Sequence, residues 1–196
     1  MQKQQKRQSS IERRRRRQKI FNRTIIVAMI IIIVVLTAVA LSRPQPTPLP
    51  SYLSRCIPLK GPWAYREVFQ LFIQINGANV TVPGGIGITS GGACVRPLYT
   101  FSNRGAIHVE PDQNRTFTLG DLFIVWGNTY GDQFGIFNQN QLFTFKTDST
   151  HHLLMRVYHG NYNFTSTDYD NYVLPRDANT TSNPYAITIS YGVFQY

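Results

Sequence analysis

The sequence predicts an α+β domain in which a mixed or antiparallel, β-rich sheet packs on one short helix, in a β-grasp-like arrangement. Three observations predict it. A hairpin of period-2 strands comes first, a short amphipathic helix follows near residue 120, and further strand patterns occupy the remainder. No internal repeat interrupts this order.

The first hairpin is centred on Asn76-Gly77. In residues 71–75, Leu, Ile and Ile alternate with Phe and Gln, which is the pattern of a strand with one buried face. Asn-Gly is the strongest short signal for a two-residue hairpin turn, and residues 80–82 supply the returning strand. Residues 95–101 and 106–110 are expected to form the next two strands.

The helix is predicted to begin after Thr118 and to end at Gly127. Thr118 can cap its N-terminus, and Asp121 stands where the helix dipole favours a carboxylate. The apolar residues fall at helical spacing on one face, and so short a helix must lie on a sheet to be stable. These residues are Leu119, Leu122, Phe123 and Trp126. Later strands are expected at 142–145, 153–158, 172–174 and 186–191.

The N-terminal part predicts a single-pass signal-anchor. Residues 1–23 form a basic tail with ten of the twenty Lys and Arg, and an uncharged run, TIIVAMIIIIVVLTAVAL, follows within residues 24–42. At 1.5 Å per residue this run spans about 27 Å, close to the thickness of the bilayer hydrocarbon. Because the basic residues precede the run, we expect a cytoplasmic N-terminus and an extracytoplasmic C-terminal domain at the cell membrane. A signal peptide cleaved after Ala38-Val39-Ala40 is the alternative.

Residues 43–51 are expected to form a Pro-rich spacer, with proline at every second position from 44 to 50. The folded domain is then predicted over residues 52–196. From Arg43 onward ten basic residues face nine acidic ones, so the basic excess belongs to the tail. Membrane lipid is the expected partner of residues 24–42, and nucleic-acid binding by the domain is not expected.

The two cysteines, Cys56 and Cys94, both follow the predicted anchor. In an oxidising compartment they are expected to form a structural disulfide, which would contribute about 3–4 kcal/mol by closing a loop of about forty residues. A redox pair or a metal site remains possible, although no Cys-x-x-Cys occurs. Four Asn-x-Ser/Thr triplets after the anchor are candidate glycosylation sites on surface loops. They start at Asn79, Asn114, Asn163 and Asn179.

His108 and Glu110 are the candidate metal ligands. In the strand Ala-Ile-His-Val-Glu, alternation places Ile107 and Val109 on one face and His108 and Glu110 on the other. Such a pair could bind a metal or transfer a proton, but it supplies only two of three or four ligands. His159 is a third candidate. The competing interpretation is a surface or locally hydrogen-bonded histidine.

Residues 73–88 and 94–127 resemble a family of uncharacterised membrane-anchored extracytoplasmic proteins, mainly archaeal. The family pattern reads Leu-His-Thr-His-Asp, Gly-x-Ile-His-Val-Glu, Phe-Thr-Leu-Gly and Trp-Gly, and the similarity extends over about residues 52–192. In that family the histidine cluster suggests copper or zinc. Here Tyr99-Thr100-Phe101 replaces His-Thr-His, so the resemblance implies a shared fold in which any metal site is lost or rebuilt.

These observations predict a membrane-anchored extracytoplasmic binding or accessory protein, an interaction subunit of a membrane complex, with no catalysis and no cofactor of its own. Neither Gly-x-Ser-x-Gly nor His-Glu-x-x-His occurs. One alternative is a divergent copper- or zinc-binding protein that uses His108 with Glu110 or His159. Another is a hydrolase of envelope polymers with Asp168 or Asp170 as its carboxylates.

Overall fold

The computed structural model describes Met29 and residues 31–33, 48–89, 91–176 and 185–194. The chain divides into two compact units, Met1–Gln45 and Pro46–Tyr196. In the first unit, Met29 and residues 31–33 are helical. No helix within the described residues combines the length and the apolarity that a bilayer span requires. The predicted basic tail and nearly all of the predicted anchor lie outside the described residues.

The described part of the second unit contains strands, one α-helix and two 3-10 helices. In chain order they are β1 (Glu67–Ile75), β2 (Ala78–Val80), β3 (Leu98–Tyr99), β4 (Ala106–Val109), α2 (Leu119–Tyr130), η1 (Asp132–Gly135), β5 (Phe137–Asn138), β6 (Gln141–Leu142), β7 (Phe145–Lys146), β8 (His152–His159), β9 (Tyr162–Ser166), η2 (Tyr169–Asn171) and β10 (Tyr185–Gly192).

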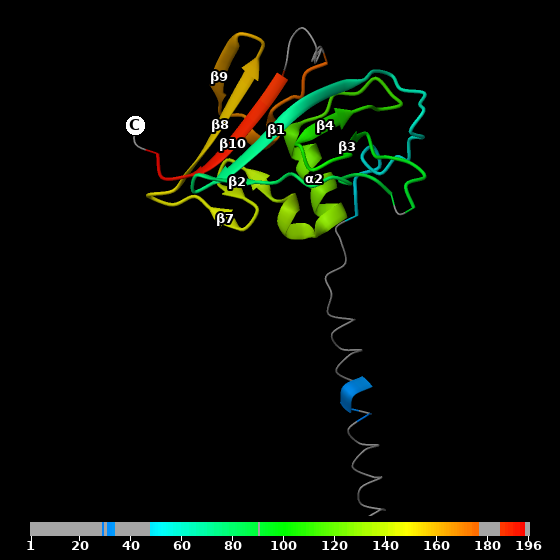
Figure 1. Cartoon of the computed structure of the whole chain (residues 1–196), viewed down its shortest axis with the longest axis horizontal. Coiled ribbons are helices and arrows are strands. Elements are labelled where there is room, and N and C mark those ends of the chain that lie inside the picture. Colours follow the sequence, from blue (N-terminus) through cyan, green and yellow to red (C-terminus); the bar gives the residue numbers. More distant parts are fainter. Residues whose placement is uncertain (1–28, 30, 34–47, 90, 177–184, 195–196) are drawn as a thin grey trace, which may run out of the picture. The chain divides into compact units, whose positions relative to one another are not determined.

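Seven strands form one mixed sheet in the order β3-β4-β1-β10-β8-β9, with β2 paired to β1 (Figure 1). The central pair, β1 and β10, is parallel, and the other pairs are antiparallel. On its other side β1 pairs with β4 along residues 67–70 and with β2 along residues 73–75. The α+β prediction with a mixed sheet is confirmed, and β5, β6 and β7 form a second, small sheet.

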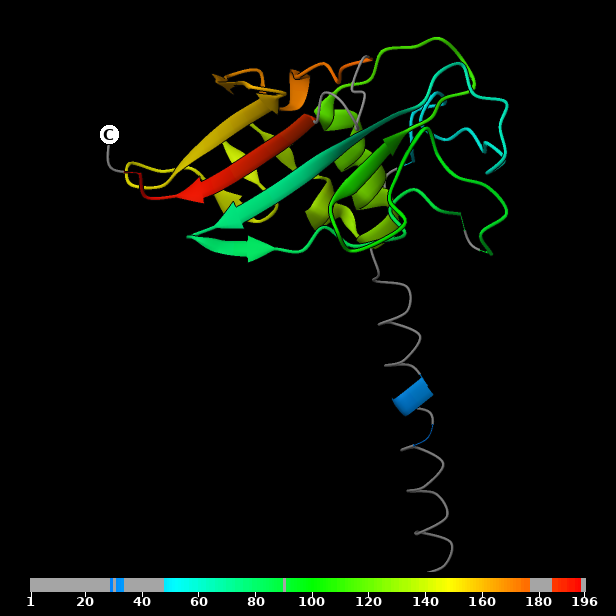
Figure 2. The same cartoon turned by 45° about the horizontal axis from the view of Figure 1, so that its top comes forward.

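The core lies between one face of the seven-stranded sheet and α2. Alternate residues of β1, β8 and β10 point into it, and the predicted apolar face of the helix packs against them. Figure 2 shows α2 behind the sheet, and among the described residues of the second unit no helix lies on the opposite face. Leu49, within the predicted spacer, also packs against this core.

The predicted hairpin turn is confirmed. Asn76 and Gly77 have φ of 50° and 80°, the left-handed conformations that a two-residue hairpin turn requires and that Asn and Gly tolerate best. The Asn76 backbone N–H donates to the Tyr191 carbonyl at 2.7 Å. This bond ties the turn to the end of β10.

The helix N-terminus is confirmed, but its predicted end is wrong. The Thr118 hydroxyl accepts from the Asp121 backbone N–H, and the Asp121 carboxylate accepts from the Thr118 N–H, a capping box. The helix continues past Gly127 to Tyr130. Gly127 serves packing instead: a Cβ there would lie 2.6 Å from the Cα of Gly135, so η1 can approach the helix only because the side chain is absent.

Three predicted strands differ from the structure. Residues 172–174 follow η2 and make only an isolated bridge, Thr118 to Val173, because they run alongside the entry to α2. Residues 142–145 contain a tight turn between β6 and β7, with Phe143 at φ 55°. In residues 95–101 only Leu98–Tyr99 is a strand, since Val95 bridges to Ile57 and Ile88 instead.

The predicted disulfide is confirmed between Cys56 and Cys94, whose Cα atoms lie 5.3 Å apart. Directly beside it, Ile57 and Val95 exchange two backbone hydrogen bonds of 2.9 Å. Both side chains are buried with Tyr99 in a small cluster separate from the main core. The disulfide therefore holds residues 48–66 against the β3 edge of the sheet.

Candidate functional site

A buried carboxylate, Glu110, is the centre of the candidate site. It directly follows β4 and is 1% exposed. The Tyr99 hydroxyl donates to Glu110 Oε2 at 2.6 Å, and Arg66 Nε donates to Oε1 at 3.0 Å. A buried carboxylate is costly unless it is paired and hydrogen-bonded, and here both oxygens have a donor.

Arg66 covers this carboxylate from the solvent side. Its guanidinium forms an ion pair with Glu110 and lies over the Trp63 ring, 4.2 Å from the ring centroid. The side chain remains 59% exposed. Arg66 therefore links the buried charge to the surface.

His108 lies beside Glu110 and is held by aromatic rings. Because β3 pairs with β4 so that Tyr99 faces His108, the two rings stack at 4.9 Å and 11°, and Phe101 packs edge-on at 5.1 Å. The His108 Nδ1 lies 3.5 Å from Glu110 Oε1 and has no hydrogen-bond partner. Burial lowers the pKa of His108, and the neighbouring Glu110 only partly opposes this. Burial and the bond to Glu110 raise the pKa of Tyr99.

Tyr99, Phe101 and His108 thus form a compact aromatic cluster. All three pairs of ring centroids lie between 4.9 and 5.1 Å apart. Phe101 is 54% exposed, so the cluster opens to solvent at one side. The rings fill the space beside His108.

The expected geometry of His108 and Glu110 is correct in part. The two side chains do meet, as alternation predicts, but Glu110 is not on an open sheet face. The strand ends at Val109, and the Glu110 N–H bonds to the Pro97 carbonyl at 2.9 Å, which places its side chain beneath Tyr99. Sequence reasoning missed Arg66 and the hydroxyl of Tyr99, because neither lies near Glu110 along the chain.

The third candidate ligand, His159, is not part of this site. It ends β8, and both β1 and β10 separate β8 from β4, a distance of about 14 Å at normal strand spacing. Its ring packs against Tyr185 instead, 5.2 Å between centroids. Within the described residues, no three His, Cys, Asp or Glu side chains are arranged to hold a metal.

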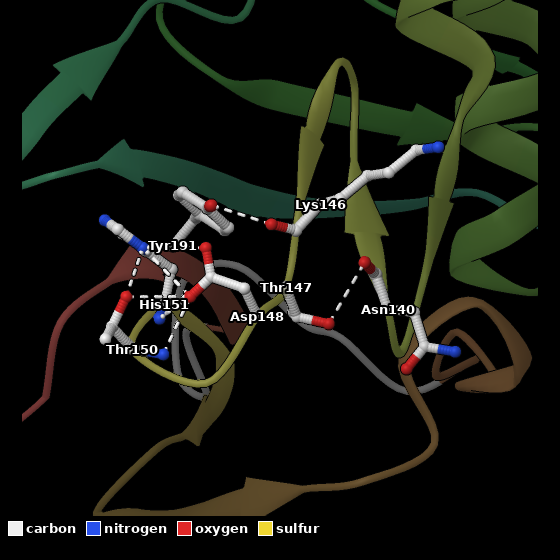
Figure 3. Close-up of polar contacts among 7 residues, drawn as sticks. All are labelled: Asn140, Lys146, Thr147, Asp148, Thr150, His151 and Tyr191. Atoms are coloured by element: carbon white, nitrogen blue, oxygen red, sulfur yellow. Dashed lines mark hydrogen bonds and ion pairs between the residues drawn. The ribbon is translucent and has the colours of Figure 1, made fainter.

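A second polar cluster joins the turn before β8 to the end of β10 (Figure 3). Asp148 Oδ1 accepts from the backbone N–H groups of Thr150 at 2.7 Å and His151 at 2.8 Å, and from the Thr150 hydroxyl at 2.8 Å. These donors lower the pKa of Asp148. His151 Nδ1 lies 3.1 Å from Asp148 Oδ2, and its ring stacks on Tyr191 at 5.6 Å and 7°. Asp-Ser-Thr-His has the composition of an Asx turn, a signal that could have been used.

The candidate hydrolase carboxylates lie elsewhere, at η2. Asp168 precedes η2 and accepts from the Ser166 hydroxyl at 3.3 Å, and Asp170 lies within it. Together with residues 138–140 they line a polar hollow of about 450 Å³. The structure thus places them beside carboxamides rather than beside His108.

Three candidate glycosylation sites are exposed, and the fourth, Asn179, lies outside the described residues. Asn79 is on β2 and Asn163 on β9. Asn114 is engaged, because its Oδ1 accepts from Arg176 at 2.6 Å while the Thr116 hydroxyl accepts from the same guanidinium at 2.7 Å.

The chain was compared with protein-family models, with curated proteins and with solved structures, and none of the three comparisons found a match.

Proposed function

We propose that this protein is a single-pass, membrane-anchored extracytoplasmic binding or accessory protein that contacts a protein partner through the uncovered face of its seven-stranded sheet. In this proposal the protein is a binding subunit of a membrane complex and does not catalyse a reaction. The charge and hydropathy of residues 1–42 support the proposed anchor and its orientation.

The observation that carries the proposal is the uncovered sheet face itself. Phe72 on β1 is 50% exposed and Tyr158 on β8 is 37% exposed, and both point away from α2. Between them β10 presents small residues: Thr188 lies opposite Phe72, and Ala186 lies opposite Tyr158. Exposed aromatic side chains are typical anchors of protein interfaces.

The chemistry of the His108 site agrees with a protein that binds rather than catalyses. Glu110 is 1% exposed and each of its oxygens already accepts a hydrogen bond, from Tyr99 or Arg66, so the carboxylate is shielded from a substrate. The His108 ring stacks on Tyr99 and contacts Phe101 edge-on. We infer that the cluster stabilises the β3–β4 edge.

The resemblance to membrane-anchored, mainly archaeal extracytoplasmic proteins supports the proposal of a binding or accessory protein. Positions 99, 101 and 108, where the family pattern has histidine, carry rings that meet here. The strand order β2-β1-β10-β8-β9 with a parallel central pair, and a helix between the hairpin and β8, supports a β-grasp-like fold. We propose that this chain keeps such a fold and has replaced a copper or zinc site by aromatic packing.

Photo-crosslinking in the native membrane tests the proposed interface. Benzoylphenylalanine replaces Phe72 or Tyr158 on the uncovered face, and Ile124 on α2 serves as the matched control, since it is 40% exposed on the other side of the domain. We expect one protein of defined mass to be captured from positions 72 and 158 but not from 124. Phe72→Glu should also remove the corresponding complex from a blue-native gel.

Two results would contradict the proposal. One is a monomeric wild-type protein with no crosslink from the uncovered face. The other is equal capture from position 124, which would indicate unspecific contact.

A further inference from the structure

We propose that a hollow at the carboxyl ends of β1 and β10 binds a neutral sugar, with Nε2 of His151 accepting a hydrogen bond from a sugar hydroxyl. The hollow measures about 440 Å³, within the range of small-molecule sites. Among its lining residues are Gln74, Asn76, His151, Ser190, Tyr191 and Phe194.

The position of the hollow follows from the sheet topology. β1 and β10 are adjacent and parallel, so their carboxyl ends meet at one edge of the sheet. There the two segments of the chain diverge. β1 turns back through Asn76-Gly77 into β2, while β10 continues to Val193 and Phe194. Residues 74–77 and 190–194, on these two diverging segments, line the hollow.

The hydrogen bonds of His151 direct one ring nitrogen outward. The Thr150 hydroxyl lies 2.8 Å from Asp148 Oδ1 and 2.9 Å from His151 Nδ1. We assign its single proton to the Asp148 carboxylate, which is charged and can only accept. The Nδ1 that lies 3.1 Å from Oδ2 must therefore carry a proton to bond there. In the neutral ring Nε2 is then an acceptor, and Figure 3 shows it pointing away from Asp148 and Thr150.

Two further contacts hold the ring in this orientation. The His151 ring stacks on Tyr191, and the Tyr191 hydroxyl donates to the Lys146 carbonyl at 2.8 Å. Asp148 is in turn held by the backbone of the turn. The His151 ring, which carries the acceptor Nε2, is thus held on one side by the Asp148 carboxylate and on the other by the ring of Tyr191 on β10.

The other lining groups match a neutral polyhydroxyl ligand. Gln74 and Asn76 offer carboxamides and Ser190 a hydroxyl, and the Ser190 hydroxyl already donates to Gln74 Oε1 at 3.3 Å. Among the described residues, no Lys, Arg, Asp or Glu lines the hollow, so those residues offer an anionic ligand no counter-charge. The carboxamides, the hydroxyl and the imidazole provide polar contacts for the hydroxyls of a sugar. An aromatic side chain provides an apolar surface for the face of the sugar ring.

A glycan array tests this site with the full chain in lipid nanodiscs, because sugar-based detergents would compete. The probes are neutral oligosaccharides of glucose, galactose, mannose or N-acetylglucosamine, together with uronate-containing counterparts. We expect at least one neutral probe to bind and the uronates to bind at least tenfold more weakly. His151→Ala should weaken binding at least tenfold, whereas His159→Ala, at the other end of β8, should leave it unchanged.

The Asp148→Asn variant tests whether the orientation of the His151 ring matters, because it keeps the ring but removes the carboxylate that holds it. It should weaken binding severalfold and shift the ¹⁵N resonances of the His151 ring, because the Nδ1–H loses its carboxylate acceptor. The inference is overturned if no neutral probe binds, or if His151→Ala binds as the wild type does. Unchanged ¹⁵N resonances in Asp148→Asn would overturn the assigned role of Asp148.

The outcome is independent of the protein interface proposed above. His151→Ala leaves Phe72 and Tyr158 in place, so crosslinking from the uncovered face should persist when sugar binding is lost. Conversely, Phe72→Glu should abolish the crosslinked complex and retain sugar binding.

Discussion

Tyr99 and Glu110 form the shortest buried link between β3 and the end of β4, a 2.6 Å hydrogen bond between side chains that are 2% and 1% exposed. The bond brings a carboxylate into the protein interior beneath the His108 ring. Arg66 supplies the second donor from before β1. The Glu110 carboxylate thereby connects three segments of the chain through hydrogen bonds.

Removing the Tyr99 hydroxyl should destabilise the protein. Tyr99→Phe leaves Glu110 Oε2 without its donor while keeping the ring, and a hydrogen bond to a charged group contributes about 1.5–3 kcal/mol. We expect the free energy of unfolding, measured by urea titration, to fall by about that amount. Tyr158→Phe, at an exposed position, is the control and should change it by less than about 0.5 kcal/mol. Equal effects of the two variants would contradict this role.

Acid should destabilise the protein through His108. Burial lowers the pKa of His108 in the folded state below its ordinary value of 6.5, so the unfolded chain binds a proton first as the pH falls. The contribution is fully present above about pH 6.5 and is lost as the pH drops from there toward the folded-state pKa. Unfolding at a series of pH values should show this loss, and His108→Gln should flatten it. An unchanged pH profile in His108→Gln would show that other groups cause the slope.

Introducing two histidines should create a metal site. In Tyr99→His/Phe101→His three imidazoles would replace the present cluster, whose ring centroids are 4.9–5.1 Å apart, with Glu110 as a further ligand. We expect the double variant to bind about one equivalent of zinc or copper by isothermal titration calorimetry, and the wild type to bind none. Adding His108→Ala should remove this binding. Stoichiometric metal on the wild type that is lost in His108→Ala would instead favour the metal-binding alternative.

Gly127→Ala should destabilise the protein although alanine is the better helix former. The gain in helix propensity is about 1 kcal/mol, but the new Cβ would lie 2.6 Å from the Gly135 Cα, a backbone atom that cannot rotate away. We expect a lower melting temperature in a thermal unfolding scan. Gly135→Ala is the matched control: its Cβ would lie 3.2 Å from Gly127, so its effect should be smaller. A more stable Gly127→Ala protein would contradict the close helix approach.

Local patterns predicted much of the fold because they report short-range physics. Asn76-Gly77 specifies a hairpin turn by backbone conformation alone, and Thr118 with Asp121 specifies a helix start by satisfying its free N–H groups. Period-2 alternation in β1 indicates which side chains face the core. The disulfide was expected because the two cysteines of the chain both follow the predicted anchor and so lie in a predicted oxidising compartment.

The ends of elements and the composition of the site could not be predicted in this way. Gly127 has the appearance of a helix stop, and only the approach of Gly135 explains why the helix runs through it. Residues 172–174 have strand composition but lie against the entry to α2, where no ladder is available. Each of these outcomes depends on a segment distant along the chain.

The sequence alone established the turn, the helix cap, the alternation of the strands and the cysteine pairing, because each depends on neighbouring residues or on simple counting. Only the tertiary structure decided that Glu110 is buried beside Tyr99 and Arg66, that His159 lies away from His108, and that the His151 ring stacks on Tyr191 of β10. Hydrogen bonds and ring contacts between distant residues require strand pairing to be in place first. The register of the sheet therefore determines which side chains meet at a site, and a local sequence pattern does not specify that register.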